Sequence, residues 1–431
     1  MRARLYAILA ISSNSLSPDM ASLRKLSLFF FLTTLLFAGC DESGGGNGGS
    51  AVLPDIKPFA KGDTVSRTLL VYLMAENDLS DFLKSDFDEI KSAACGLTDD
   101  VRLFVYFDNS DPRRLPSLLQ YHPYEGHLVE NVAFAFDSDV CSSDTAALGM
   151  VLDAMFADYP TRAFDLVLGS HADGWVRHHA KSALNRTIGV DNGRNDYSYN
   201  KTTVIEIEEL AALLERLPVK VDRLMFDACL MQGVEVAYAL RNAANWIIAS
   251  AAEIPADGAP YDKMVPLFLD PVSTVEDIMY EYKKSYDNEY YAAVLSAVRT
   301  SCMQELADAT SVCVEKYFNA ETVNNYSSCL AYVPRKAPAY YDFNSVMKKF
   351  LEQVDYAVWK TVYDKAVPYA MVSNKRKVYS NVAGGVVINI TDDYGAVSAY
   401  FPQDKSQNET SNSDFCTTEW YRAAGWDAAG W

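Results

Sequence analysis

His171 and Cys229 are the two side chains of this sequence whose types and positions predict joint chemistry. Each follows an apolar run rich in β-forming residues, at 164–170 before the histidine and 222–228 before the cysteine. The carboxyl ends of neighbouring parallel strands meet at one edge of an α/β sheet, where active sites are assembled. An adjacent imidazolium lowers the pKa of a thiol and makes it a nucleophile. The pair therefore predicts a cysteine hydrolase.

The elements that must position this pair alternate between apolar runs and amphipathic helical patterns. We expect strands at 69–74, 101–107, 164–171, 222–229, 246–251, 384–390 and 396–401, and helices at 79–94, 144–156, 207–214, 230–243 and through most of 275–362. Asp144 is placed to cap the second helix. Continuous apolar strands separated by helices predict an α/β fold with a mostly parallel central sheet covered by helices on both faces.

The first 39 residues resemble an export signal. Arg24 and Lys25 precede a short apolar run, which ends in small residues directly before Cys40. This ending resembles a bacterial lipobox, so we expect Cys40 to be a lipidated mature N-terminus. Residues 40–65, rich in glycine and serine near their start, then form a flexible tether. The alternative is an ordinary cleaved signal.

The chain is acidic, with a formal net charge of −19 over 431 residues. Nucleic acid and anionic lipid surfaces are poor partners for such a body, whereas cationic substrates are favoured. Six cysteines besides Cys40 and Cys229 allow disulfides in an exported chain, and none is spaced as CxxC. A zinc or redox site is therefore not expected.

Four segments carry a family resemblance: 69–79, Ser170 to Trp175, Phe226 to Met231, and 397–402. Together they resemble the signatures of clostripain-type cysteine peptidases of the caspase-like clan. The resemblance implies a caspase-like three-layer sandwich over residues 66–402, with a helical insertion at 275–362. An aromatic tail follows at 403–431.

The resemblance also implies roles at the site. Cys229 would attack the scissile carbonyl, and His171 would protonate the leaving amine. Backbone N–H groups of Ala172 and Cys229 would stabilise the oxyanion. Alanine stands at 172 where the family usually has glycine, which restricts φ but keeps the N–H.

Acidic residues are implied beneath the pocket for the residue before the cut. Asp227 matches the family position, and Asp257 lies about where a second would fall. Buried carboxylates would select Arg or Lys by a charge-assisted pair. The structural alternatives are a turn or cap partner for Asp227 and a simple Asp-Gly turn for Asp257.

A polar loop at 176–203 follows the histidine motif and contains several basic residues. An enzyme that cuts after such residues would be able to cut itself here, and relatives are matured in this way. The candidate positions are Lys181, Arg186, Arg194 and Lys201.

No cofactor is required by this chemistry, and no metal site is assigned. His171, Asp173, His178 and His179 are ligand types, but their spacing fits no compact metal motif. A structural or activating calcium ion is implied by the family without a location. The expected protein is a monomer in the cell envelope, held to the membrane by its lipid, that acts on proteins or peptides with basic residues. The alternative is a catalytically inactive surface binding protein on a peptidase scaffold.

Overall fold

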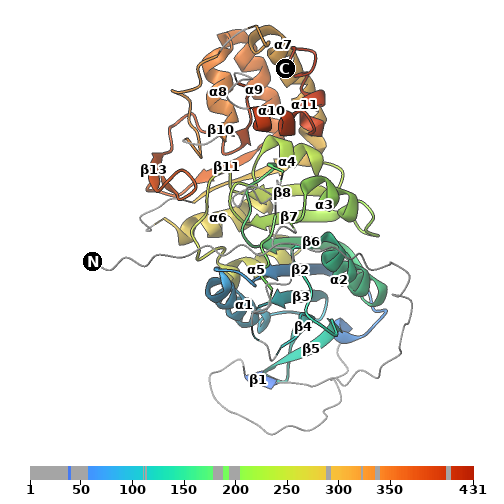
Figure 1. Cartoon of the computed structure of the whole chain (residues 1–431). Helices are drawn as coiled ribbons and strands as arrows, with labels where there is room; N and C mark the ends of the chain where they lie inside the picture. Colours follow the sequence, from blue (N-terminus) through green and yellow to red (C-terminus); the bar gives the residue numbers. More distant parts are fainter. Residues whose placement is uncertain are drawn as a thin grey trace, which may run out of the picture. The chain divides into compact units, whose positions relative to one another are not determined.

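A central sheet organises the computed structural model (Figure 1), which describes residues 37–39, 57–109, 111, 114–177, 188–193, 204–287, 293–321, 324–334, 340–403 and 409–431. In spatial order its strands are β1 (Phe37–Gly39), β5 (His127–Ala135), β4 (Ser117–Tyr124), β3 (Val101–Asp108), β2 (Val65–Met74), β6 (Thr161–Gly169), β7 (Val221–Asp227), β8 (Ala244–Ala249), β9 (Val294–Arg299) and β11 (Tyr369–Val372).

The middle of this sheet is parallel. Strands β3, β2, β6, β7 and β8 run in the same direction, and antiparallel strands extend the sheet at both sides. The parallel strands are nearly continuous apolar runs because they are buried on both faces, and all eight residues of β3 are buried. The predicted fold class, a mostly parallel sheet between helical layers, is confirmed.

Helices cover both faces, as Figure 1 shows. Alternate residues of β2 divide between two cores, because successive side chains of a strand point to opposite faces. Leu69, Val71 and Leu73 share one core with α1 (Ser80–Ala94), α5 (Tyr261–Leu269) and α6 (Val275–Ser285). Leu70 and Tyr72 share the other with α2 (Thr145–Asp158), α3 (Ile207–Leu214) and α4 (Val234–Ala239). Helix α2 is capped by Asp144, whose side chain accepts a hydrogen bond from the Ala146 N–H at 2.8 Å.

The C-terminal part of the chain adds further elements to the core on the α4 side. They are η2 (Thr300–Cys302), α7 (Met303–Tyr317), β10 (Tyr341–Asp342), α8 (Phe343–Phe350), α9 (Gln353–Ala366), β12 (Lys377–Ser380), β13 (Val386–Asn389), β14 (Ser398–Ala399), α10 (Glu409–Phe415) and α11 (Glu419–Ala423). At the other end of the described chain, the short helix η1 (Lys57–Phe59) precedes β2. Trp359, Trp420 and Trp426 are all buried in this core. Helix α11 packs against α4, the first helix after Cys229, so the aromatic tail supports the region that carries the cysteine.

Three differences from the sequence predictions concern element boundaries. The expected helical stretch 275–362 contains strand β9, whose buried residues pair with β8 on one side and β11 on the other. The antiparallel hairpin β4–β5 was not predicted; it turns at Glu125 and Gly126, both with positive φ. Helix α4 begins at Val234 rather than at 230, because the chain turns at 229–230 and Gly233 forms a bridge with Ser398 before the helix starts. In the part of the chain that is described, no helix combines the length and apolar character needed to cross a membrane.

Candidate active site

His171 and Cys229 reach the same cavity from adjacent strands. Gly169, the last residue of β6, pairs with Asp227, the last residue of β7. Each candidate lies two residues beyond its strand, so parallel pairing carries both to the same edge of the sheet. Both side chains line a cavity of about 740 Å³.

The two loops that carry these side chains touch through their backbones. Gly174 has φ +74°, and a Cβ atom at this position would lie 2.7 Å from the carbonyl oxygen of Leu230. Glycine is therefore required both for the backbone conformation and for the close approach. Tyr340 fixes the histidine loop from the other side, since its hydroxyl donates to the Asp173 carbonyl at 2.5 Å. The glycine of this motif thus has a packing explanation.

The turn after Cys229 holds a strained backbone. Leu230 is buried with φ +63°, a left-handed conformation that is uncommon for a branched side chain. The segment after β8 holds it there: the Leu230 N–H donates to the Ala252 carbonyl at 3.0 Å, and the Gln232 N–H donates to the Ser250 carbonyl at 2.9 Å. Backbone strain of this kind concentrates at functional sites, where the surrounding structure over-determines it.

The Cys229 thiol is protonated in this arrangement. Its Sγ accepts a hydrogen bond from the Ile254 N–H at 3.4 Å. Burial, followed by the nearby carboxylates of Glu253 and Asp173, raises the pKa of the Cys229 thiol to about 12. The sulfur therefore needs a base, or a rearrangement of its neighbours, before it becomes a nucleophile at neutral pH.

The imidazole of His171 has a carboxylate partner. Its Nε2 lies 2.7 Å from Oδ1 of Asp78, which follows β2 in the first of the four motif segments. Asp78 is 84% exposed, so water and salt weaken this interaction. In the described part of the chain, the imidazole hydrogen-bonds to Asp78 and not to the thiol of Cys229. The two side chains share a cavity but are not joined.

The backbone positions expected to form the oxyanion hole also border the cavity. Ala172 is buried and lines it together with Cys229. Residue Ala172 forms an antiparallel bridge with Ile188, and the Gly189 N–H donates to the His171 carbonyl at 2.9 Å. The loop after the histidine is therefore held in place on both sides of Ala172. Its role in oxyanion binding stays a prediction.

Of the two acidic residues expected beneath the substrate pocket, the structure places only one at the cavity. Asp227 is buried and lines the cavity, whereas Asp257 is exposed and is not among the lining residues. A second buried carboxyl does line it, that of Asp86 on α1. Sequence reasoning missed Asp86, although an acidic residue next to Phe87 on the buried face of an amphipathic helix was an available signal.

A hairpin distant in sequence completes one wall. Tyr379 on β12 lines the cavity, together with Asn381 and Val382 at the turn between β12 and β13. The N–H groups of Asn381 and Val382 donate to Oε1 of Glu253, at 3.0 and 3.3 Å. Glu253 therefore connects this hairpin to the segment that faces Cys229.

Several sequence candidates lie outside the described residues. They are the proposed lipid site Cys40 and the self-cleavage candidates Lys181, Arg186, Arg194 and Lys201. The described chain stops at Arg177 and resumes at Ile188, close to the histidine, since the neighbouring Gly189 bonds to His171.

Three carboxylates outside the cavity lining are arranged as metal ligands. Oxygens of Glu76, Asp108 and Asp139 lie within 4.8 Å of one another, and the first two residues are buried. Oxygen donors of this kind fit calcium. Asp108 also accepts a hydrogen bond from the Tyr106 hydroxyl at 3.3 Å. The calcium ion that the family resemblance implies stays a prediction, and this cluster is a candidate place for it.

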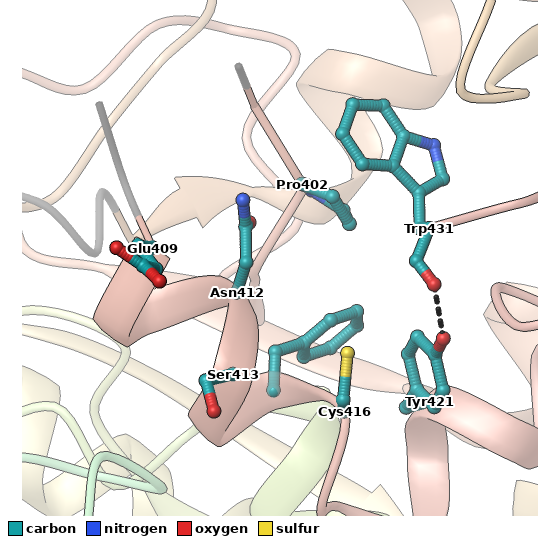
Figure 2. A pocket seen from close by; sticks show the side chains of 8 residues that line it. Pro402, Glu409, Asn412, Ser413, Cys416, Tyr421 and Trp431 are labelled. Atoms are coloured by element: carbon teal, nitrogen blue, oxygen red, sulfur yellow. Dashed lines mark hydrogen bonds between the residues drawn. The ribbon is translucent and has the colours of Figure 1, made fainter. Parts of the chain in front are cut away.

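A second cavity of about 330 Å³ lies in the C-terminal region (Figure 2). Pro402, Phe415, Cys416 and Trp431 are among its lining residues, and the Tyr421 hydroxyl donates to the Trp431 carbonyl. Among the described residues that line it there is no histidine to act as the base that thiol chemistry needs. No disulfide joins the cysteines of the described residues, Cys416 among them.

Comparison with known proteins agrees with this geometry. The profile of the clostripain family matches residues 71–431. Clostripain of Hathewaya histolytica is 25% identical over 232 residues, which cover 46% of this chain and 41% of that protein. The match thus spans less than half the length of this relative.

Solved structures extend the likeness over most of the chain. A secreted C11 cysteine protease from Bacteroides thetaiotaomicron, in complex with an irreversible peptide inhibitor, has a TM-score of 0.72 and 28% identity, covering 84% of this chain and all of that one. An inactive zymogen C11 protease from Parabacteroides distasonis has a TM-score of 0.70 and 25% identity, covering 86% and 99%. The family match and these likenesses agree with the sheet order and the cavity: the chain belongs to the clostripain family.

Proposed function

We propose that this chain, a cysteine-type endopeptidase by its family, hydrolyses peptide bonds after arginine or lysine and uses Cys229 and His171 to do so. The observation that carries the proposal is one cavity lined by a cysteine, a histidine and two buried acidic residues. A secreted relative of similar structure is a cysteine protease. This supports an extracytoplasmic peptidase in preference to an inactive binding scaffold.

The proposed reaction proceeds by acyl transfer. The Cys229 sulfur, once deprotonated, attacks the carbonyl carbon, and the C–N bond breaks as His171 gives a proton to the leaving amine. Water then attacks the thioester and releases the new carboxyl terminus. The N–H groups of Ala172 and Cys229 would donate to the developing oxyanion.

Specificity would come from the acidic end of the cavity. A guanidinium or ammonium group placed there would pair with Asp227, which is buried and therefore only weakly screened. Kinetics with matched peptides, carrying Arg, Lys or the neutral arginine analogue citrulline before the cut, test this directly. Turnover of citrulline peptides as fast as arginine peptides would exclude the proposed specificity.

The catalytic roles are tested by Cys229→Ala and His171→Ala. Each should lower kcat on an arginine peptide by at least about a thousandfold, since nucleophile and proton donor act in the same step. His127→Ala, at an exposed histidine in the β4–β5 hairpin, is the matched control. Unchanged turnover by Cys229→Ala would end the proposal.

Self-processing in the loop 176–203 is part of the same proposal. It is supported by the protonated thiol in this intact chain and by the zymogen described for a similar structure. N-terminal sequencing of the purified wild type should find a new terminus after Lys181, Arg186, Arg194 or Lys201. The Cys229→Ala protein should remain one chain.

We also propose that the protein is attached to the cell envelope by a lipid on Cys40, as a monomer. The lipobox-like ending of the first 39 residues supports this. Cys40→Ala should release the protein from the membrane fraction, while wild type should partition with membranes. Equal partitioning of both would refute the anchor.

A further inference from the structure

Two buried carboxyls lie together at one end of the cavity. Asp86 comes from α1 and is 3% exposed, and Asp227 ends β7 and is 5% exposed. The position that a Cβ atom on Gly258 would occupy is 2.8 Å from Oδ2 of Asp227 and 3.3 Å from Oδ2 of Asp86. Both carboxyls therefore border the same small space, and both line the cavity.

The hydrogen bonds around this pair are incomplete. Oδ2 of Asp227 accepts from the Ala259 N–H at 3.0 Å and from the Tyr261 hydroxyl at 2.9 Å. Oδ1 of Asp227 and Oδ2 of Asp86 are buried and have no hydrogen-bond partner among the described residues. Buried carboxyl oxygens are normally satisfied, so this space lacks donors that a ligand would supply.

The surroundings disfavour two negative charges. Burial, then the charges of Asp227, Glu89 and Asp257, raise the pKa of the Asp86 carboxyl to about 9. Burial also raises the pKa of Asp227, against the opposing hydrogen bonds from Ala259 and Tyr261.

Three further titratable groups of the described residues interact with this pair, and none of the three supplies a compensating positive charge. They are Tyr261 on α5, Tyr282 on α6 and the Cys229 thiol, all neutral at physiological pH because burial raises the pKa of each. Two carboxyls this close and this buried keep at least one proton between them while the space is empty.

We propose that Asp86 is a second specificity-determining residue, and that the Asp86–Asp227 pair takes up the cation of the substrate in exchange for the proton it holds. This rests on the proposed preference for Arg or Lys. On binding, the carboxyl O–H releases its proton to solvent, and N–H groups of the substrate donate to the freed oxygens. A guanidinium offers five donors in a planar fork and an ammonium three, so two carboxylates favour arginine over lysine.

The test is the ratio of kcat/KM for an arginine peptide to that for the matched citrulline peptide, measured from pH 6 to pH 9. Ionisation of Cys229 and His171 affects both substrates and cancels in the ratio. In wild type the ratio should rise with pH, by up to about tenfold per unit, because one proton is displaced. In Asp86→Asn it should be independent of pH and about tenfold lower at pH 8, from the loss of one charge-assisted bond. Asp88→Asn, at an exposed position of the same helix, should behave as wild type.

A binding measurement tests the proposed proton release in protein that keeps Asp86. Calorimetry of an arginine peptide binding to Cys229→Ala, in two buffers of different ionisation enthalpy, reports the protons released at pH 7. We expect close to one proton per site with arginine and none with citrulline. No proton release, or an unchanged and pH-dependent ratio in Asp86→Asn, would overturn this inference but leave the proposed function standing. A wild type that does not prefer arginine to citrulline at any pH would overturn the proposed function itself.

Discussion

Gly258 is the position where a single methyl group tests the architecture of the acidic end of the cavity. Its φ of +62° is left-handed, and an added Cβ would lie 2.8 Å from Oδ2 of Asp227. An alanine in this conformation costs about 1–2 kcal/mol in backbone energy. The clash adds to this, since the neighbour is a carboxylate held by two hydrogen bonds rather than a mobile chain end.

The expected result of Gly258→Ala is a selective loss of activity on cationic substrates. The methyl group occupies the space that the substrate's cation would enter and displaces Asp227 from its partners. Loss of one charge-assisted contact of about 1.5–3 kcal/mol lowers kcat/KM on an arginine peptide by about 10- to 100-fold. Activity on the matched citrulline peptide should fall much less.

The control for this substitution is Gly62→Ala. Gly62 has φ +83°, but a Cβ there would meet no atom within 4 Å. It therefore carries the backbone cost without the clash, and urea denaturation should show both variants destabilised. If Gly258→Ala keeps arginine activity within about twofold of Gly62→Ala, the assignment of this space to the substrate's cation is wrong.

Three further predictions follow from the charged groups. The rate at which iodoacetamide alkylates Cys229 should rise with pH throughout the range from 7 to 10, because the pKa of the thiol is raised to about 12. Glu253→Gln should increase this rate, because it removes a negative charge that raises the pKa of the thiol. Asp86→Asn should raise the Tm by several degrees at pH 8, and this gain should vanish near pH 4. The pKa of Asp86 is about 4 in the unfolded chain and is raised to about 9 in the folded protein. The folded state therefore loses stability relative to the unfolded state as the pH rises between these two values, and the substitution removes that loss. Calcium added to chelator-treated protein should raise the Tm of the wild type but not of Asp139→Asn, and equal shifts in both would place the ion elsewhere.

The fold could be predicted where periodicity was strong. The continuous apolar run of β2 and the amphipathic pattern of α1 specify a buried parallel strand and its covering helix, and the positions of His171 and Cys229 after such strands brought them to one edge. The β4–β5 hairpin was missed because Pro123 interrupts the strand pattern and its turn begins with Glu125 rather than with asparagine or glycine.

The composition of the cavity was harder to predict than its position. Asp86 belongs to a helix, α1, whose apolar stripe is evident in the sequence. The sequence does not show that the part of this helix with Asp86 borders the cavity. Tyr379 and Asn381 come from a hairpin about 150 residues after Cys229, and only tertiary packing brings them there. The substrate-binding role of Asp257 was inferred from the resemblance alone. In the structure Asp257 lies in a turn and is exposed to solvent.

The most direct test of the account is covalent labelling by a peptidyl-arginyl acyloxymethyl ketone, a thiol-directed affinity reagent, followed by peptide mapping. We predict one adduct, on Cys229, that forms far more slowly in His171→Ala and with the citrulline analogue of the reagent. An adduct on another cysteine, or an unlabelled Cys229 in protein that turns over arginine peptides, would contradict the assignment of this sulfur as the nucleophile.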